Sequence, residues 1–310
     1  MENEINNIKI KVIGIGGGGN NAVNHIVADN VKNIETYIIN TETKILKRAN
    51  TKNTLQIGKE TTKGLGAGAN PEIGEKSALE NKEEIKQILK NTDLVFLTAG
   101  MGGGTGTGAI SVIAQLAKEM GILTVAIVTK PFAFEGNQRK QKADIGIEKL
   151  KENVNALIVI LNDNLIKISE DKTSVNEAFS LADNVLKQGI QSITDLITNI
   201  GEINLDFADL KTILNYKGQA YMGIGTDNKG NIIEATKKAI ANPLTEKQID
   251  NAKGIIFNVK GSSNLSLNDI NSSIQLINDR VDKNANVFFG TVIDKTLKDN
   301  IIVTVIATGI

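Results

Sequence analysis

The chain has 310 residues, and its 35 basic and 35 acidic side chains give a formal net charge of zero. This length predicts about two domains, and the balanced charge gives no indication of a nucleic-acid partner. Cysteine is absent, which excludes disulfides and thiolate metal sites, and histidine occurs once, as His25, which excludes a histidine-rich metal site. We predict no metal-ligating residues. Apolar runs stay far below the ~18 residues that cross a bilayer, so we expect a cytoplasmic protein that does not insert into membranes.

Apolar strands alternate with helical patterns through the first half of the chain. Such an alternation predicts a Rossmann-like α/β domain, with a parallel sheet covered on both faces. The expected elements, in chain order, are a strand at 8–15, a glycine and asparagine turn at 16–21, a helix at 22–28, a strand at 34–39, a glycine-rich loop at 61–74, a helix at 76–90, a strand at 94–99, a helix at 109–120, a strand at 122–129, a helix at 138–151 and a strand at 156–161.

The second half begins with a long helical pattern at 173–199, whose wide apolar face is typical of a central helix. After it we expect strands at 220–225, 254–259, 287–293 and 301–307, with helices at 232–241 and 267–281. Two consecutive strands at the end favour a smaller α/β domain with a mixed sheet. The predicted division is therefore a domain at 1–172, a central helix and loop at 173–203, and a C-terminal domain at 204–310.

Three glycine-rich turns stand out. Between Gly100 and Gly108, six of nine residues are glycine, and the run joins an apolar strand to a helix. Such a turn presents backbone N–H groups and a helix N-terminus to an anion. The turn at 14–19 contains Gly-x-Gly-x-x-Gly, which alone fits either a dinucleotide site or a structural turn. With a third turn at 64–69 and no P-loop motif, the pattern predicts a polyphosphate held mainly by backbone N–H groups.

Two pairs of side chains suggest how a nucleotide is recognised. Glu135 and Arg139 follow a strand end, where a carboxylate can accept ribose hydroxyls; a solvated ion pair is the alternative. Phe179 and Asp183 share one helix face, so that Phe179 can stack on a base while Asp183 accepts N–H groups from a guanine edge. The alternative is that Phe179 belongs to the core and Asp183 to the surface.

Asp206 and Asp209 follow the long helix and are three residues apart. Paired carboxylates can orient water or assist metal binding. The alternative is structural, with Asn204 or Asp206 as the N-cap of a helix at 208–215.

The run Gly-Gly-Gly-Thr-Gly-Thr-Gly at 102–108 resembles the signature loop of the tubulin/FtsZ family of GTPases, and the chain is most similar to its bacterial cell-division branch. Five further motifs follow the family's order over nearly the whole chain, at 12–22, 64–71, 131–136, 182–186 and 204–209.

The resemblance implies that the chain binds GTP and GDP, with Mg²⁺ on the phosphates. The glycine turns would contact the phosphates, and Ala67 would face the γ-phosphate. Glu135 and Arg139 would contact the ribose and phosphates. Asn162, Phe179 and Asp183 would recognise guanine. The residues expected to bind nucleotide are Gly17, Gly18, Gly19, Asn20, Asn21, Ala67, Gly102, Gly103, Gly104, Thr105, Gly106, Thr129, Glu135, Arg139, Asn162, Phe179 and Asp183.

The same resemblance makes Asn204, Asp206 and Asp209 catalytic residues. In the family this loop completes the GTPase site of the next subunit in a head-to-tail filament. The expected function is therefore a self-assembling GTPase of the mid-cell division ring, with a GTP-binding domain at 1–172 and an activation domain at 204–310. Two alternatives are an NAD-dependent oxidoreductase, which explains only the first glycine turn, and a filament-forming relative that does not hydrolyse GTP.

The sequence departs from the family pattern at Glu42, Leu161 and Asn164. It also ends at Ile310, directly after the last expected strand. We therefore do not expect it to contain the family's C-terminal peptide, which binds membrane tethers and division regulators.

Overall fold

The computed structural model describes residues 8–31, 33–168, 173–198, 206–216, 218–241, 244–262 and 265–310, leaving out the side chains of residues 167 and 168. The chain divides into two compact units, in which most contacts join residues of the same unit. The first unit comprises Met1–Val154 with Leu165–Gln188, and the second comprises Asn155–Asn164 with Gly189–Ile310.

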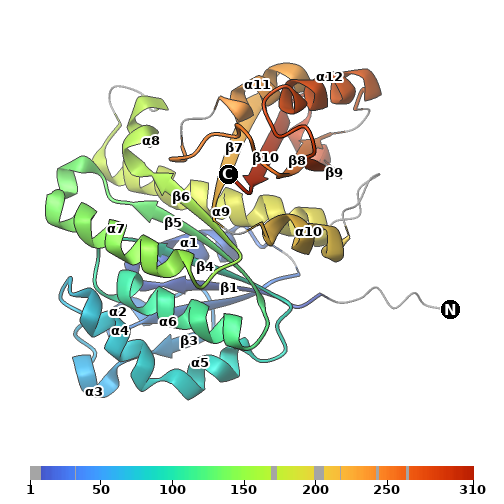
Figure 1. The fold of residues 1–310 in the computed structure, drawn as a ribbon. Helices are drawn as coiled ribbons and strands as arrows, with labels where there is room; N and C mark the ends of the chain where they lie inside the picture. The colour runs from blue at the N-terminus through green and yellow to red at the C-terminus, as the bar shows by residue number, and fades with distance from the viewer. Residues whose placement is uncertain are drawn as a thin grey trace. The chain divides into compact units, whose positions relative to one another are not determined.

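The first unit contains a parallel sheet with the strand order β3-β2-β1-β4-β5 (Figure 1). Its strands are β1 (Ile10–Ile15), β2 (Glu35–Asn40), β3 (Thr54–Gln56), β4 (Leu94–Gly100) and β5 (Leu123–Lys130). Every residue of β1 is buried, and so are all but the last residues of β4 and β5. Burial on both faces explains why these strands are continuously apolar rather than alternating.

Helices cover this sheet, with α1 packed on β1, β2 and β4, and α6 packed on β1, β4 and β5. The helix α4 lies in turn against α6. The helices of the first unit are α1 (Gly16–Ala28), α2 (Thr43–Leu46), α3 (Lys59–Thr62), α4 (Pro71–Glu80), α5 (Lys82–Leu89), α6 (Thr105–Glu119) and α7 (Asn137–Lys151), with a 3₁₀ turn, η1, at Ala133–Glu135.

The sequence prediction was wrong at several helix boundaries, since α6 begins at Thr105 rather than at 109, and α4 begins at Pro71 within the loop expected at 61–74. The turn expected at 16–21 is confined to Gly16, which has a φ of +70°, and α1 begins at that residue. The helix expected at 76–90 is broken at Asn81 into α4 and α5. The buried Asn81 side chain accepts a hydrogen bond from the backbone N–H of Gly58 at 2.8 Å, a long-range contact that no periodicity reveals.

The second unit contains a mixed sheet with the strand order β6-β7-β10-β8-β9, which confirms the mixed sheet predicted for the C-terminal part (Figure 1). The strand β10 runs antiparallel to β7 and β8, whereas β6 with β7 and β8 with β9 are parallel pairs. The strands are β6 (Ala156–Leu161), β7 (Gln219–Asp227), β8 (Gly254–Gly261), β9 (Asn286–Ile293) and β10 (Ile301–Thr308).

Buried side chains of this sheet form the core of the second unit with the helices α11 (Ile232–Ile240) and α12 (Leu267–Asn278). Tyr221 and Phe257 are the largest residues of this core. The helix α10 (Phe207–Leu214) packs on β8, and a 3₁₀ turn, η2 (Lys295–Leu297), precedes β10.

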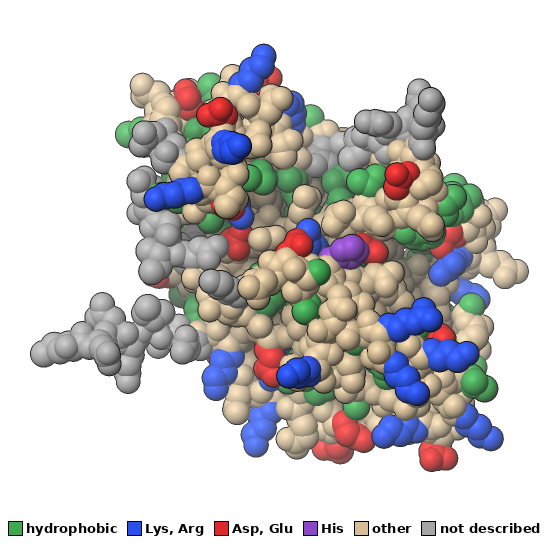
Figure 2. Space-filling model, turned by 180° about the vertical axis from the view of Figure 1, so that it is seen from behind, with side chains coloured by type: hydrophobic (Ala, Val, Ile, Leu, Met, Phe, Trp, Pro, Cys, Tyr) green, Lys and Arg blue, Asp and Glu red, His purple; other side chains and the backbone are tan. Residues whose placement is uncertain are grey.

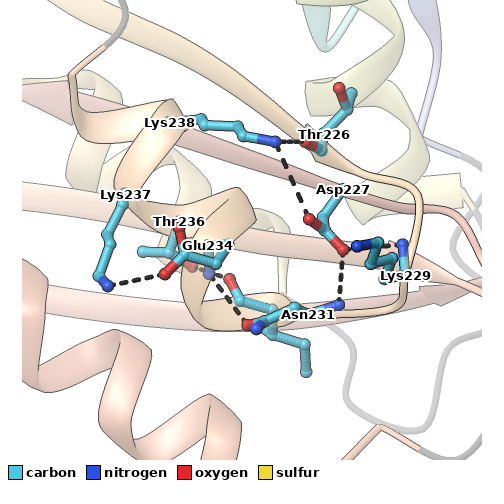
Figure 3. A network of polar contacts seen from close by, with 9 residues as sticks. Thr226, Asp227, Lys229, Asn231, Glu234, Thr236, Lys237 and Lys238 are labelled. Carbon is cyan, nitrogen blue, oxygen red and sulfur yellow. Dashed lines mark hydrogen bonds and ion pairs between the residues drawn. The ribbon is translucent and has the colours of Figure 1, made fainter.

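A polar network fixes the connection from β7 into α11 (Figure 3). The Asp227 carboxylate accepts hydrogen bonds from the backbone N–H groups of Asn231 and Lys229, at 3.0 and 2.8 Å, and these bonds lower its pKa. The Asn231 side chain caps α11 by accepting from the N–H of Glu234 at 3.1 Å. The network satisfies N–H groups that the first turn of a helix leaves free.

Two helices are divided between the units. The helix α8 (Asn162–Ile168) begins in the second unit, and α9 (Val175–Thr198) passes from the first unit into the second after Gln188. The 24 residues of α9 span about 36 Å, close to the long helix expected at 173–199. The domain boundaries expected at 172 and 203 stay predictions.

Within the described parts of the chain, no helix is long and apolar enough to cross a membrane. Basic and acidic side chains intermingle on the face in Figure 2.

We expect Gly225→Ala to destabilise the protein, because α11 lies directly on the backbone of β7. A methyl group on Gly225 would lie 1.9 Å from the carbonyl oxygen of Ala235. The free energy of unfolding should fall by about 1–3 kcal/mol, measured by urea denaturation followed by circular dichroism. Thr226→Ala, at the adjacent exposed position, is the control. Equal losses in the two variants would contradict the packing argument.

Candidate functional site

Two strand-to-helix turns lie at one edge of the first unit's sheet. The strands β1 and β4 are parallel neighbours, with Gly14 paired to Thr98, so both end at this edge. There α1 begins at Gly16 and α6 begins at Thr105, and neither helix has an acidic residue in its first turn. Two helix N-termini side by side make this edge favourable for an anion.

Most of the glycines here permit close packing. A methyl group on Gly19 would lie 2.2 Å from the carbonyl oxygen of Thr98. One on Gly104 would lie 2.7 Å from the methyl carbon of Ala67, which is itself buried. Gly18 and Gly106 are similarly close, with backbone atoms at 3.1 Å. These glycines bring the turns together.

Three other glycines border open space. A methyl group on Gly17, Gly68 or Gly103 would meet no heavy atom within 4 Å. We call the open backbone surface at these three glycines, beside the two helix N-termini, the cradle. The dense glycine pattern has two physical causes, close packing and an open backbone surface, which the sequence does not distinguish.

Buried polar side chains hold the shape of the turns. The side-chain amide of Asn20 is oriented so that its nitrogen and its oxygen both have hydrogen-bond partners. The nitrogen donates to the carbonyls of Gly14 and Gly16, at 3.0 and 2.8 Å, and the oxygen accepts from the Asn40 side chain at 2.9 Å. The structure therefore gives the Asn20 side chain a role within the turn. Asn40 lies at the end of β2, and no sequence motif indicates its role.

The threonines of the glycine run have different partners. The hydroxyl of Thr107 accepts the N–H of Gly102 at 2.8 Å, whereas the hydroxyl of Thr105 lies 2.7 Å from that of Thr41. On β5, the buried Thr129 accepts the N–H of Met101 through its carbonyl oxygen at 2.9 Å. Thr107 and Thr129 thus fix both sides of the run.

Glu135 and Arg139 form an ion pair at the edge of the same sheet, just beyond β5. Arg139 Nη1 lies 2.8 Å from Glu135 Oε2, and the carboxylate is buried while the guanidinium is exposed. Glu135 Oε1 also accepts the N–H of Phe132 at 2.9 Å. A methyl group on Gly102 would lie 2.6 Å from the carbonyl oxygen of Arg139. The pair is thus built into the wall of the glycine loop.

Three phenylalanines form a cluster beside this wall. The rings of Phe132 and Phe134 stack at 5.0 Å, and Phe179 meets them edge-on at 5.3 and 6.2 Å. Phe132 is buried, but Phe134 and Phe179 are 58% and 38% exposed. Phe179 is therefore not simply a core residue. Phe132 and Phe134 were not predicted as site residues, although both lie in the motif at 131–136.

Asp183 lies one helical turn after Phe179 and is buried, so the interpretation of this residue as a surface residue is wrong. Burial raises the pKa of its carboxyl to about 7, although a hydrogen bond with the Asn21 side chain acts in the opposite direction. A buried carboxylate with an unsatisfied charge is costly to the fold. Such a group is a candidate for binding a partner that donates hydrogen bonds.

The remaining predicted residues belong to the second unit. Asn162 begins α8, and its buried Oδ1 has no hydrogen-bond partner among the described residues. Asn204 lies outside the described residues. Asp206 is the N-cap residue of α10, but its side chain makes no capping hydrogen bond, and Asp209 lies in the first turn. Helix capping by Asp206 therefore does not explain this pair.

Carboxylates are dispersed rather than clustered. Within the described ranges, no group of three or more His, Cys, Asp or Glu residues lies close enough to hold a metal ion. Glu42, one of the departures from the family pattern, forms an isolated bridge with Leu65. A methyl group on Gly66 would lie 3.7 Å from its carboxylate oxygen. Glu42 thus lies beside the third glycine turn.

Substitution of neighbouring glycines should separate the two causes of the pattern. We expect Gly19→Ala to lower the free energy of unfolding by about 1–3 kcal/mol, because of the close approach to β4. Gly17→Ala should leave stability unchanged or slightly raised, because it meets no neighbour. Thermal unfolding followed by circular dichroism checks both. A Gly17→Ala protein as unstable as Gly19→Ala would show that the cradle is not open.

The burial of Asp183 predicts a pH-dependent stability difference. Its pKa is about 7 in the folded protein, above the ordinary value of 3.8, so the folded state binds this proton more tightly. The unfolding free energy that Asp183 contributes therefore falls as pH rises from 4 to 7 and is then constant. Relative to Asp183→Asn, the ligand-free wild type should lose on the order of 4 kcal/mol between pH 4 and pH 8. Urea denaturation of both proteins across this range measures it, and a constant difference would contradict the burial argument.

The comparisons with known proteins agree with this architecture. Residues 9–170 match the tubulin/FtsZ family, GTPase domain, and residues 218–310 match the FtsZ family, C-terminal domain. The chain is similar to an empty FtsZ dimer from M. jannaschii, with 40% identity, a TM-score of 0.93, and coverage of 97% of this chain and 88% of that chain. A mutant FtsZ from M. jannaschii has 39% identity, a TM-score of 0.93, and coverage of 98% and 91%.

A more distant match shows the fold alone. CetZ2 from Haloferax volcanii, described as a GTPγS-bound protofilament, has 16% identity, a TM-score of 0.84, and coverage of 97% of this chain and 93% of that chain. The bacterial origin expected from the resemblance is not established by these matches. They favour a GTPase over an NAD-dependent oxidoreductase. The two family matches and the M. jannaschii likenesses show that the chain belongs to the tubulin/FtsZ family of GTPases, in its FtsZ branch.

Proposed function

We propose that this protein binds GTP at the edge of the first unit's sheet and hydrolyses it within a head-to-tail filament of its own copies. One subunit supplies the nucleotide-binding residues, and Asp206 and Asp209 of the next subunit complete the site. The observation that carries this proposal is the acidic pair at the start of α10, which does not cap its helix. The family resemblance supports a catalytic role for these carboxylates.

The open cradle suits the phosphates. Its exposed backbone at Gly17, Gly68 and Gly103 leaves room that a side chain would fill. The two helix N-termini supply N–H donors and a favourable dipole for negative charge. Mg²⁺, when bound, would neutralise charge on the phosphates. Because the described carboxylates do not cluster, we expect phosphate oxygens rather than a side-chain cage to hold it.

The buried end of the site suits guanine. Ionised Asp183 would accept the two N–H groups of the guanine edge, with Phe179 against the base and Asn21 close by. The hydrogen bonds would satisfy a carboxylate that burial otherwise makes costly. Glu135 and Arg139 would meet the ribose and phosphates, and we retain Asn162 as a further guanine contact.

Phosphoryl transfer depends mainly on positioning and on charge stabilisation, with little covalent chemistry for the protein to perform. Asp206 and Asp209 would orient the attacking water against the terminal phosphate. A head-to-tail contact is heterologous and does not close on itself, so it generates a filament. We place this filament in the cytoplasm at the mid-cell division ring, where membrane tethers and regulators would bind through a C-terminal peptide of the family type that is not among these 310 residues.

Hydrolysis should therefore depend on assembly. We expect phosphate release per protein molecule to rise with protein concentration above a threshold, together with GTP-dependent light scattering. If specific activity is constant over the same range, the site is complete in one chain. Scattering without phosphate release would instead favour the filament-forming relative that does not hydrolyse GTP.

Asp209→Ala should keep GTP binding but lower turnover by about 10²-fold or more, since it removes a group that acts on the attacking water. Asp269→Ala is the matched control, because Asp269 occupies the same first-turn position in α12 of the same unit. It should turn over like the wild type. Excess Asp209→Ala protein added to wild type below its assembly threshold should raise phosphate release, because each wild-type subunit in the mixed filament presents Asp209 to GTP on a neighbouring copy, and turnover unchanged by this addition would contradict a site shared between subunits.

A further inference from the structure

We propose that Lys142 is a positioning residue that holds the loop at 64–70 in the conformation that recognises the terminal phosphate of GTP. This inference rests on the proposed function, and it assigns a role to a lysine outside the family motifs. Lys142 Nζ donates a hydrogen bond to the carbonyl oxygen of Ala69 at 2.8 Å.

The loop has an unfavourable backbone that needs support. Gly64, Gly66 and Gly68 have φ values of +78°, +92° and +56°, and Lys63 and Ala69 have +52° and +58°. Glycine adopts this region readily, but a residue with a β-carbon does so at a cost. Ala69 is therefore the point in the loop where an external hydrogen bond matters most.

The two ends of the loop are anchored by other contacts. At its start, Gly64 accepts the N–H of Thr43 at 3.3 Å, and Leu65 forms its bridge with Glu42. At its end, Asn70 caps α4 by accepting the N–H of Glu72 at 3.0 Å. Between them, at residues 66–69, Lys142 makes the one hydrogen bond that comes from another element among the described residues.

Lys142 also lies on the helix that supports the glycine loop. It follows Arg139 by three residues on α7, and the Arg139 carbonyl lies directly behind Gly102. On the other side, Gly104 approaches both Ala67 and Asn70, so the loop at 64–70 and the glycine run are in contact. One helix thus fixes both walls of the cradle.

The Lys142 ammonium group has two N–H donors besides the one that Ala69 accepts. Among the described residues it forms no ion pair, and Ala69 occupies only one of its three N–H groups. Gly68, the open glycine of this loop, lies next to Ala69. Lys142 therefore adds positive charge at the wall that we assign to the γ-phosphate, in a site without a P-loop lysine.

This arrangement predicts a selective loss of affinity. Because GDP lacks the group that this loop would contact, Lys142→Met should weaken GTP binding by about tenfold and change GDP binding by less than about twofold, as expected for a hydrogen bond from a charged group. We would measure both dissociation constants by calorimetry in an Asp209→Ala background, so that GTP persists, at concentrations below assembly.

Two variants serve as controls. Lys142→Arg keeps the charge and a donor and should restore the preference for GTP. Lys140→Met removes an exposed lysine from the same helix and should leave both affinities unchanged. Melting temperatures measured on the same samples separate binding from folding, and Lys142→Gln replaces the methionine variant if that variant does not fold.

The outcomes distinguish this inference from the proposed function. If the parent protein binds neither GTP nor GDP, the proposed function is wrong. If the parent binds both nucleotides but Lys142→Met weakens them equally, or weakens neither, Lys142 does not position the loop for the terminal phosphate. A selective loss of GTP affinity that Lys142→Arg restores supports the inference.

Discussion

Close approach of two backbones is the constraint on which the first unit depends. The helix α1 can follow β1 directly only because Gly14 and Gly19 leave room for each other, since a methyl group on Gly14 would lie 2.2 Å from the Gly19 carbonyl oxygen. Gly108 permits the same approach between α6 and α4, with the Pro71 carbonyl oxygen at 1.9 Å from a methyl position. The two helix N-termini therefore lie at one sheet edge, and the anion site that we propose there follows from how the layers pack.

Electrostatics within this edge follow from the same packing. The Glu135 carboxylate is neutralised by Arg139 and held by a backbone N–H, so it does not oppose an anion over the helix N-termini. Asp183 is not neutralised in this way, and its burial raises its pKa to about 7. The two carboxylates are thus distinguished by their surroundings, one as part of the wall and the other as a group available to a donor.

The sequence predicts features that depend on local pattern and misses those that depend on distant partners. Apolar runs located β1, β4 and β5, and the glycine motifs located the site edge. The break at Asn81 could not be predicted, because it arises from a contact with Gly58 far away in the chain. The bond between Lys142 and Ala69 is equally invisible, since it joins residues 73 positions apart. Spacing predicted that Phe179 and Asp183 share a face but did not reveal that Asp183 is buried while Phe179 is exposed.

Features that cost stability cluster at the residues we assign to function. Burial of Asp183 disfavours its charged form, Ala69 adopts a backbone region suited to glycine, and the Asp206 side chain leaves its helix uncapped. Each could be relieved by a residue that suits its local structure better, namely a neutral side chain, a glycine and a capping serine. Stability of the fold alone gives no reason for these three features to be present together. Their coincidence with the edge that we assign to the nucleotide and with the start of α10 is explained when Asp183 accepts hydrogen bonds from a base, Ala69 shapes a phosphate-facing loop, and Asp206 acts on a neighbouring subunit.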